Sequence, residues 1–223
     1  MKFNSKETAE HTPVKEAARV GIDPGFFNVN KNRGETARVD SHSRQYHINY
    51  LGDTEMIKSA DIKKAGEMVI MSADFIRQHA ETPVERKAAE ILLSLINAKR
   101  IVLCDTSRLY GRSVYGSFCF DNENPYIAID IDIALEKGTA ELVDTLFHEA
   151  YHAAQYNAGN KNNLLKEEAR AWNLGLGMSN KYRQEHGESV VRTRPYTEQE
   201  LLVMGYSNRE GCSGFAEICK EAP

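Results

Sequence analysis

A run of five residues, His-Glu-Ala-Tyr-His at positions 148–152, constrains this chain most, because it lies inside a long amphipathic helical pattern. The pattern predicts a helix from Thr139 to about residue 158. At about 100° per residue, the apolar residues gather on one side, while His148 and His152 fall on the opposite side, about 6 Å apart. We therefore expect a helix that is buried on its back and shows both imidazoles to a polar cleft. The apolar side consists of Leu142, Val143, Leu146, Phe147, Ala150, Ala153 and Ala154, and the histidine side also carries Glu141, Asp144 and Gln155.

The two histidines and the glutamate between them have the chemistry of a zinc site. Neutral imidazoles one helical turn apart can hold one Zn²⁺ ion, whose open position admits a water with a pKa lowered from about 16 towards about 7. Glu149 lies about 100° round the helix from His148, beside the ion. Its carboxylate can take a proton from the attacking water and return it to a leaving amine. The pattern predicts His148 and His152 as zinc ligands and Glu149 as the catalytic general base and acid. The alternative, a chance motif on a surface helix, is disfavoured by the helical context.

A third ligand is expected from the next helix, predicted over residues 164–182, where Glu167 and Glu168 are the candidates. Glu168 lies roughly 40–60° from Leu165 and Trp172, whereas Glu167 points about 160° away from Leu165. Because a buried carboxylate needs a partner, Glu168 is the predicted metal ligand. A salt bridge to a neighbouring arginine or lysine is the alternative role. The apolar stripe used for this choice is Leu165, Ala169, Trp172 and Leu176.

The other patterns predict short strands between helices. The stretch 126–133 alternates four isoleucines with Ala128, Asp130 and Asp132, which is typical of a strand with one buried face and one polar face that is open to a ligand. Predicted strands cover residues 44–51, 100–105, 114–121 and 126–133, and predicted helices cover 60–79 and 84–98, with Pro83 in the first turn of the second.

These elements predict an α+β fold with a flexible leader and a single domain. Residues 1–40 have no sustained periodicity and form the expected leader. Residues 41–223 form the expected domain, in which 41–158 is an upper half with the histidine helix and 159–223 is a lower half with the third ligand.

Composition excludes several classes of protein. The chain has a net charge of −4 and no Lys/Arg-rich run with interleaved aromatics, so nucleic acid is not an expected partner. No window is apolar enough to span a bilayer, and the first residues lack the apolar core of a secretory signal, so we expect synthesis in the cytoplasm and no membrane insertion. Four cysteines without a CxxC pair indicate reduced thiols, although Cys212 and Cys219 could pair in an oxidising environment.

With His148, Glu149, His152 and Glu168 in these positions, the chain resembles the zincin metallopeptidases, in particular the gluzincin type, whose third ligand is a glutamate on a following helix. The resemblance implies a zincin-like fold, with a small mixed or antiparallel sheet, an active-site helix and a following ligand helix. It also implies a Zn²⁺ cofactor, a protein substrate, and an edge strand that binds extended substrate, which we place at residues 126–133.

Beyond the zinc helix, residues 167–175 and 197–202 look loosely like small metallopeptidases that bacterial pathogens inject through type III secretion. This likeness implies an effector protease that enters a host cell without a Sec signal. The predicted function is a zinc-dependent endopeptidase. The alternative is a metal-stabilised binding protein with a structural zinc site, closed by Asp144 or Glu141 as a further ligand.

Overall fold

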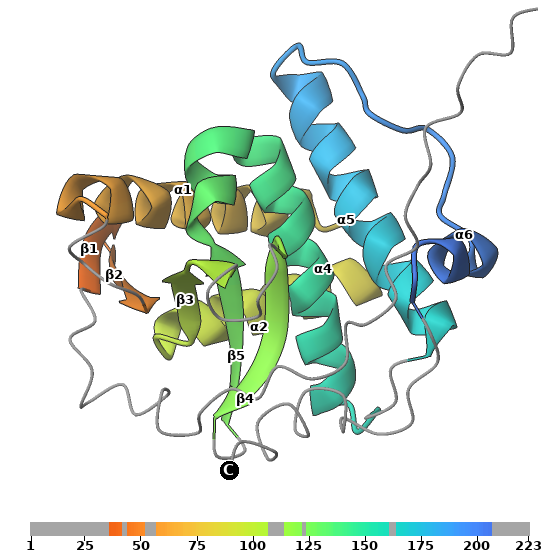
Figure 1. Ribbon diagram of the computed structural model, residues 1–223, viewed down its shortest axis with the longest axis horizontal. Helices are drawn as coiled ribbons and strands as arrows, with labels where there is room; N and C mark the ends of the chain where they lie inside the picture. Colours follow the sequence, from red (N-terminus) through yellow and green to blue (C-terminus); the bar gives the residue numbers. More distant parts are fainter. Residues whose placement is uncertain are drawn as a thin grey trace, which may run out of the picture.

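The computed structural model describes residues 36–41, 44–51, 57–106, 114–121, 124–160 and 164–206. These form one five-stranded sheet and a set of helices (Figure 1), which confirms the predicted α+β class. The strands are β1 (Thr36–Ser41), β2 (Arg44–Leu51), β3 (Ile101–Cys104), β4 (Gly116–Asp121) and β5 (Asn124–Asp130). The helices are α1 (Ser59–His79), α2 (Pro83–Asn97), a π-helical turn η2 (Ile133–Lys137), α4 (Thr139–Asn157), α5 (Leu165–Glu185) and α6 (Glu198–Val203).

The sheet is mixed, with the strand order β1-β2-β3-β5-β4. Strands β2, β3 and β5 are parallel to one another, whereas β1 and β4 are antiparallel to their neighbours at the two edges. Strand β2 has the predicted bounds. Strand β1 was not predicted: Thr36 pairs with Asn49, so residues 36–40 belong to the sheet and not to a flexible leader. Residues 1–35, Cys212 and Cys219 lie outside the described residues.

The prediction of an edge strand at residues 126–133 is wrong. Strand β5 lies between β3 and β4, and Ile127, Ala128 and Ile129 are all buried, so neither face is open. The strand also ends at Asp130, because the Asp130 carboxylate accepts a hydrogen bond from the main-chain N–H of Asp132 (3.0 Å) and turns the chain. The edge strand next to α4 (Thr139–Asn157) is β4 instead.

Helices α1, α2 and α4 enclose one core with the sheet, and the predicted apolar side of α4 faces it. Pro83 lies in the first turn of α2, as predicted, and Thr82 and Glu85 form a capping box at the start of the same helix. All seven predicted apolar residues of α4 are buried, among them Leu146 and Phe147.

Figure 1 shows α4 with β4 along one side of it and α5 along the other. Gly116 allows the close approach of β4, because a Cβ at this position would lie 2.6 Å from the Thr145 methyl group. Further along, Phe118 and Phe120 make ring contacts with Tyr156. Strand β4 therefore runs beside the helix that carries the histidines. None of the described helices is both long and apolar enough to cross a membrane. Cys104 and Cys119 are both buried and form no disulfide bond with each other.

Candidate metal centre

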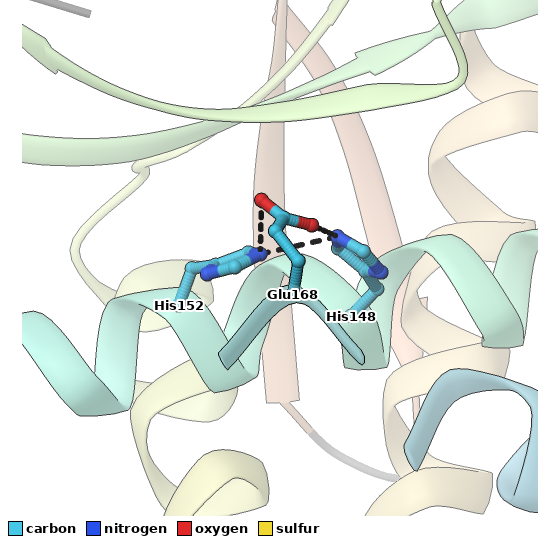
Figure 2. A group of neighbouring side chains, drawn as sticks. All are labelled: His148, His152 and Glu168. Carbon is cyan, nitrogen blue, oxygen red and sulfur yellow. Dashed lines mark hydrogen bonds and ion pairs between the residues drawn. The ribbon is translucent and has the colours of Figure 1, made fainter. Parts of the chain in front are cut away.

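Three side chains from α4 and α5 converge on one point, and they are the three predicted ligands (Figure 2). Nε2 of His152 lies 3.1 Å from Nε2 of His148. The two carboxylate oxygens of Glu168 lie 3.6 Å from His148 Nε2 and 3.5 Å from His152 Nε2. Within the described residues, this is the one group of three or more His, Cys, Asp and Glu side chains whose ligand atoms lie close enough together to hold an ion.

These separations fit a tetrahedral metal site. With ligands at about 2.0–2.1 Å from Zn²⁺, two ligand atoms are about 3.3–3.4 Å apart. The observed 3.1 to 3.6 Å brackets that value. Two imidazoles and one carboxylate are also a donor set that zinc accepts, with a fourth position left for water. The residues present therefore fit the ion.

Burial sets the protonation of His148 and Glu149. Burial, and secondly the neighbouring His152, lower the pKa of His148 to about 3, so its imidazole is neutral, as a metal ligand requires. Burial raises the pKa of Glu149 to about 7, and the Glu168 carboxylate acts in the same direction, while His152 and the main chain of Phe118 oppose it. Glu149 thus lies within the field of the other site residues and against the edge strand β4. A carboxyl group with a pKa near neutrality can both accept and return a proton.

The prediction that Glu167 points away from the interior is wrong. Glu167 is as buried as Glu168, and its Oε2 accepts a 2.5 Å hydrogen bond from the Tyr151 hydroxyl on α4. Its Oε1 accepts from Arg170 at 3.0 Å. Burial, and then Glu167, raise the pKa of Tyr151, so this phenol keeps its proton.

The cause of the error is the direction of the apolar stripe of α5. Leu165 and Ala169 pack against Leu201 of α6, a helix that was not predicted from the sequence. The side that meets α4 is instead built from the small residues Ala171 and Gly175, about 80–120° round from Leu165. Both glutamates flank that side.

A second set of polar contacts joins α4 and α5 about one to two turns from the histidines. Ser179 donates a hydrogen bond to Asp144 (3.2 Å), and Arg183 forms an ion pair with Glu141 (2.5 Å). Gly175 lies on α5 between Glu168 and Ser179, and the two helices touch there: an added Cβ would lie 2.7 Å from the main-chain oxygen of Asp144. Asp144 and Glu141 are therefore engaged with α5 and are not part of the metal cluster.

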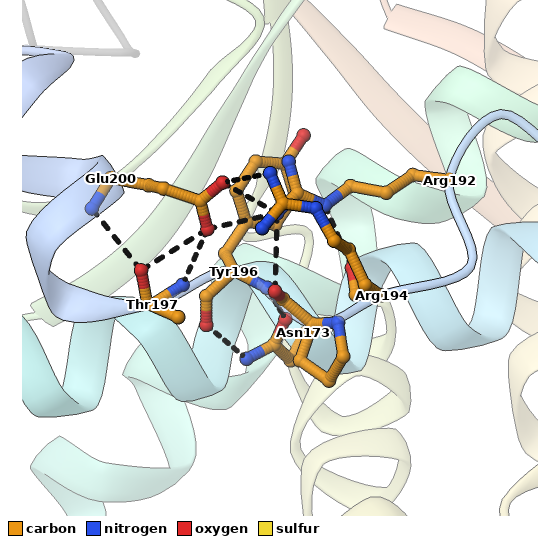
Figure 3. A network of polar contacts seen from close by, with 7 residues as sticks. Asn173, Arg192, Arg194, Tyr196, Thr197 and Glu200 are labelled. Atoms are coloured by element: carbon orange, nitrogen blue, oxygen red, sulfur yellow. Dashed lines mark hydrogen bonds and ion pairs between the residues drawn. The ribbon is translucent and has the colours of Figure 1, made fainter.

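An aromatic group borders the site on the side of His148. Trp172 contacts His148 edge to face, with ring centroids 5.3 Å apart, and itself packs against Tyr196 and Tyr206. Figure 3 shows how the segment before α6 is held: Asn173 exchanges two hydrogen bonds with the main chain of Tyr196. Arg192 lies over the Tyr196 ring and pairs with Glu200, which also caps α6 through Thr197.

The ring side chains that follow Glu168 in the sequence lie in two separate groups, Tyr182 with His186, and Tyr196 with Tyr206 against Trp172. Tyr182 and His186 stack on each other near the end of α5, and Tyr182 contacts Phe75 of α1. Tyr196 and Tyr206 are linked to His148 through Trp172.

Comparison with protein-family models, with curated proteins and with solved structures gives no match for this chain. The fold and the site define an α+β protein with a candidate three-ligand metal centre. The resemblance to gluzincins and to injected effector proteases stays a prediction from the sequence.

Proposed function

We propose that this protein is a zinc-dependent endopeptidase of the gluzincin type, with His148, His152 and Glu168 as metal ligands and Glu149 as general base and acid. The observation that carries the proposal is the convergence of these three ligand atoms within 4.8 Å of one another. The buried Glu149 directly follows His148 in the sequence, and the charges of His152 and Glu168 act on its carboxylate. A zinc ion held there would supply a Lewis acid that polarises a substrate carbonyl and acidifies water.

Glu149 is suited to its role by position and by protonation. It follows His148 directly on α4, and its carboxylate is close enough to His152 and Glu168 for their charges to shift its pKa. A hydrogen bond from the main chain of Phe118 to the Glu149 carboxylate favours its ionised form and acts against the rise in its pKa. Glu149 can therefore take up a proton when water attacks and donate it to the departing amine.

The edge strand β4 offers a place for an extended substrate. The N–H of Asp130 donates to the oxygen of Tyr115, so by the alternation of an antiparallel pair Ser117 and Cys119 also face β5. The main-chain groups of Gly116, Phe118 and Phe120 then point away from β5, on the outer edge of the sheet, where the Phe118 N–H already meets the Glu149 carboxylate and the other groups are left for a substrate. A peptide that pairs with this edge would run beside α4 and past Glu149.

The alternative function, a structural zinc site, requires a fourth protein ligand. Its two candidates are Asp144, which accepts from Ser179, and Glu141, which pairs with Arg183. This arrangement favours an open, catalytic site over a closed one.

The test begins with metal content. Protein purified without added metal is expected to contain one equivalent of zinc, and His148→Ala none. The wild type and Glu149→Gln are then incubated with a library of peptides, and cleavage is followed by mass spectrometry. We expect Glu149→Gln to keep its zinc and to cleave about 10²–10⁴-fold more slowly. If zinc-loaded Glu149→Gln cleaves at the wild-type rate, the proposed mechanism is wrong. If the zinc-loaded wild type cleaves no peptide, the proposed activity is wrong.

A further inference from the structure

We propose that Tyr151 and Glu167 act as a positioning pair that holds Glu168 in place and thereby raises the affinity of the site for zinc. This inference rests on the proposed metal site, but it does not depend on the reaction that the site catalyses.

The pair joins the same two helix segments as the ligands do. On α4, Tyr151 precedes the ligand His152; on α5, Glu167 precedes the ligand Glu168. The Tyr151 hydroxyl donates to Glu167 Oε2 at 2.5 Å, and both residues are buried, with exposed fractions of 1% and 8%. Two successive carboxylates of α5 thus reach two successive residues of α4.

The position of Glu168 depends on how the first turn of α5 is held. The N-cap residue of α5 is Leu164, whose apolar side chain makes no capping hydrogen bond. On its other side, the turn is held by the contact of Leu165 with Leu201 of α6, which is apolar and without directional preference. The hydrogen bond from Tyr151 to Glu167 is directional, and it fixes the orientation of this turn of α5 relative to α4. Because neighbouring Cα atoms are about 3.8 Å apart, a shift of Glu167 must move the Glu168 carboxylate relative to the two imidazoles.

Arg170 completes the arrangement from the solvent side. Its guanidinium donates to Glu167 Oε1 at 3.0 Å, so each oxygen of the Glu167 carboxylate has its own donor and the group cannot rotate without losing both. Groups that hydrogen-bond a metal ligand directly typically change metal affinity about 10–100-fold when removed. Since this pair acts on Glu168 only through the adjacent residue, we expect an effect near the lower end of that range.

The experiment measures zinc affinity of the full chain by competition with a chelator of known affinity, after metal removal and with folding checked by circular dichroism. The variants Tyr151→Phe and Glu167→Ala remove the bond from either side. Glu167→Gln keeps an oxygen that can accept from Tyr151. Ser179→Ala is the matched control, because it removes a buried hydrogen bond between the same two helices at the end away from the histidines.

We expect Tyr151→Phe and Glu167→Ala to bind zinc about 10-fold more weakly than the wild type, Glu167→Gln to recover most of the loss, and Ser179→Ala to bind as the wild type does. The visible absorption spectrum of the Co²⁺-loaded protein should change in the first two variants and not in Ser179→Ala, since it reports ligand geometry and not stability.

If folded Glu167→Ala binds zinc as tightly as the wild type, the inference is wrong, although the metal site is not. The same holds if Ser179→Ala loses as much zinc affinity as Glu167→Ala does. If Tyr151→Phe does not fold, the pair Glu167→Ala and Glu167→Gln decides. Undiminished zinc binding by His148→Ala would instead overturn the proposed site itself, and the inference with it.

Discussion

The contact between α4 and α5 has two ends that are built from similar residues for different purposes. At one end, Asp144 and Glu141 of α4 are matched by Ser179 and Arg183 of α5 in direct hydrogen bonds and ion pairs. At the other end, two imidazoles and the Glu168 carboxylate crowd together with 3.1 to 3.6 Å between their ligand atoms. The first arrangement stabilises the helix pair as it stands. The second concentrates buried polar groups around a point that a cation would satisfy.

The two ends differ in the free energy of burying their polar groups in the metal-free protein. Burying polar groups is favourable only where their partners are close and complementary. Arg183 meets that condition through its ion pair with Glu141, and Asp144 meets it in part through its hydrogen bond from Ser179. Under the proposed function, the histidine end would meet it with an ion, so we expect its residues to add little to the stability of the metal-free protein.

The largest effect should come from His148→Ala. With one of three ligands lost, zinc affinity should fall by more than the roughly 100-fold that an outer partner costs. The free energy of unfolding of the metal-free protein should stay close to that of the wild type, because functional residues seldom contribute to stability. Chelator competition and urea denaturation in EDTA measure the two quantities. A large loss of stability in the metal-free variant would remove the distinction between the two ends.

The next effect concerns Gly175, which lies where the two ends meet. A methyl group there would lie 2.3 Å from Asp144 Oδ1 and 2.7 Å from its main-chain oxygen, so α5 must move away from α4. We expect Gly175→Ala to lower the free energy of unfolding by about 3 kcal/mol, near the upper end of the usual range for overpacking.

Gly177 is the matched control for Gly175. It lies two residues further along α5, is exposed, and has nothing within 4 Å of an added Cβ. Gly177→Ala should therefore stabilise the protein by about 0.5–1 kcal/mol, because alanine favours the helix. Denaturant unfolding of both variants gives the comparison, and a similar effect of both substitutions would show that the close contact at Gly175 is unimportant.

Helix α4 could be predicted from sequence because its large apolar residues face the main core, which makes the polar side easy to recognise. The same reasoning chose Glu168 correctly for the cluster but misplaced Glu167. On α5 the large residues face α6, whereas the side facing α4 is made of small ones such as Ala171 and Gly175. A stripe of small residues carries little hydrophobic signal, although it marks a close helix contact.

The strands show a different limit. Alternating residues predicted a strand at 126–133, but alternation describes the two faces of a strand and not its place in the sheet. That β5 is internal and β4 lies at the edge follows from pairing between segments distant in sequence, such as Leu103 with Ile129. A short connection after β5 was also hidden, since the Asp130 turn interrupts a pattern that continues to Ile133.

The pH dependence of stability should distinguish the ends further. Burial raises the pKa of Asp144 to about 6, against which Ser179 and Arg183 act. Since the folded protein then holds this proton more tightly than the unfolded chain does, stability contributed by Asp144 is present at low pH and is lost as pH rises from about 4 to about 6. We expect Asp144→Asn, which cannot ionise, to be more stable than the wild type at pH 7, by on the order of 1–3 kcal/mol, and similar to it at pH 4.

Urea denaturation of the two proteins in EDTA, at pH 4 and pH 7, measures this difference. The metal-free form is used because zinc binding has its own pH dependence. If the Asn variant is less stable than the wild type at pH 7, the ionised carboxylate is stabilised by its partners, and Asp144 contributes through charge and not only through hydrogen bonding.

The smallest expected loss of stability is that of Ser179→Ala. Ser179 is fully buried and donates to Asp144, so its loss should cost about 1 kcal/mol of unfolding free energy, the usual net value of one hydrogen bond. Because the Ser179 hydroxyl stabilises the ionised form of Asp144, the cost should be larger at pH 7 than at pH 4, which is opposite in sign to the effect of Asp144→Asn. Combining the two substitutions in a double-mutant cycle at pH 7 measures their coupling. A coupling energy of zero would mean that the two residues contribute independently, and that this end of the contact is held by packing at Gly175 and by the Glu141–Arg183 pair alone.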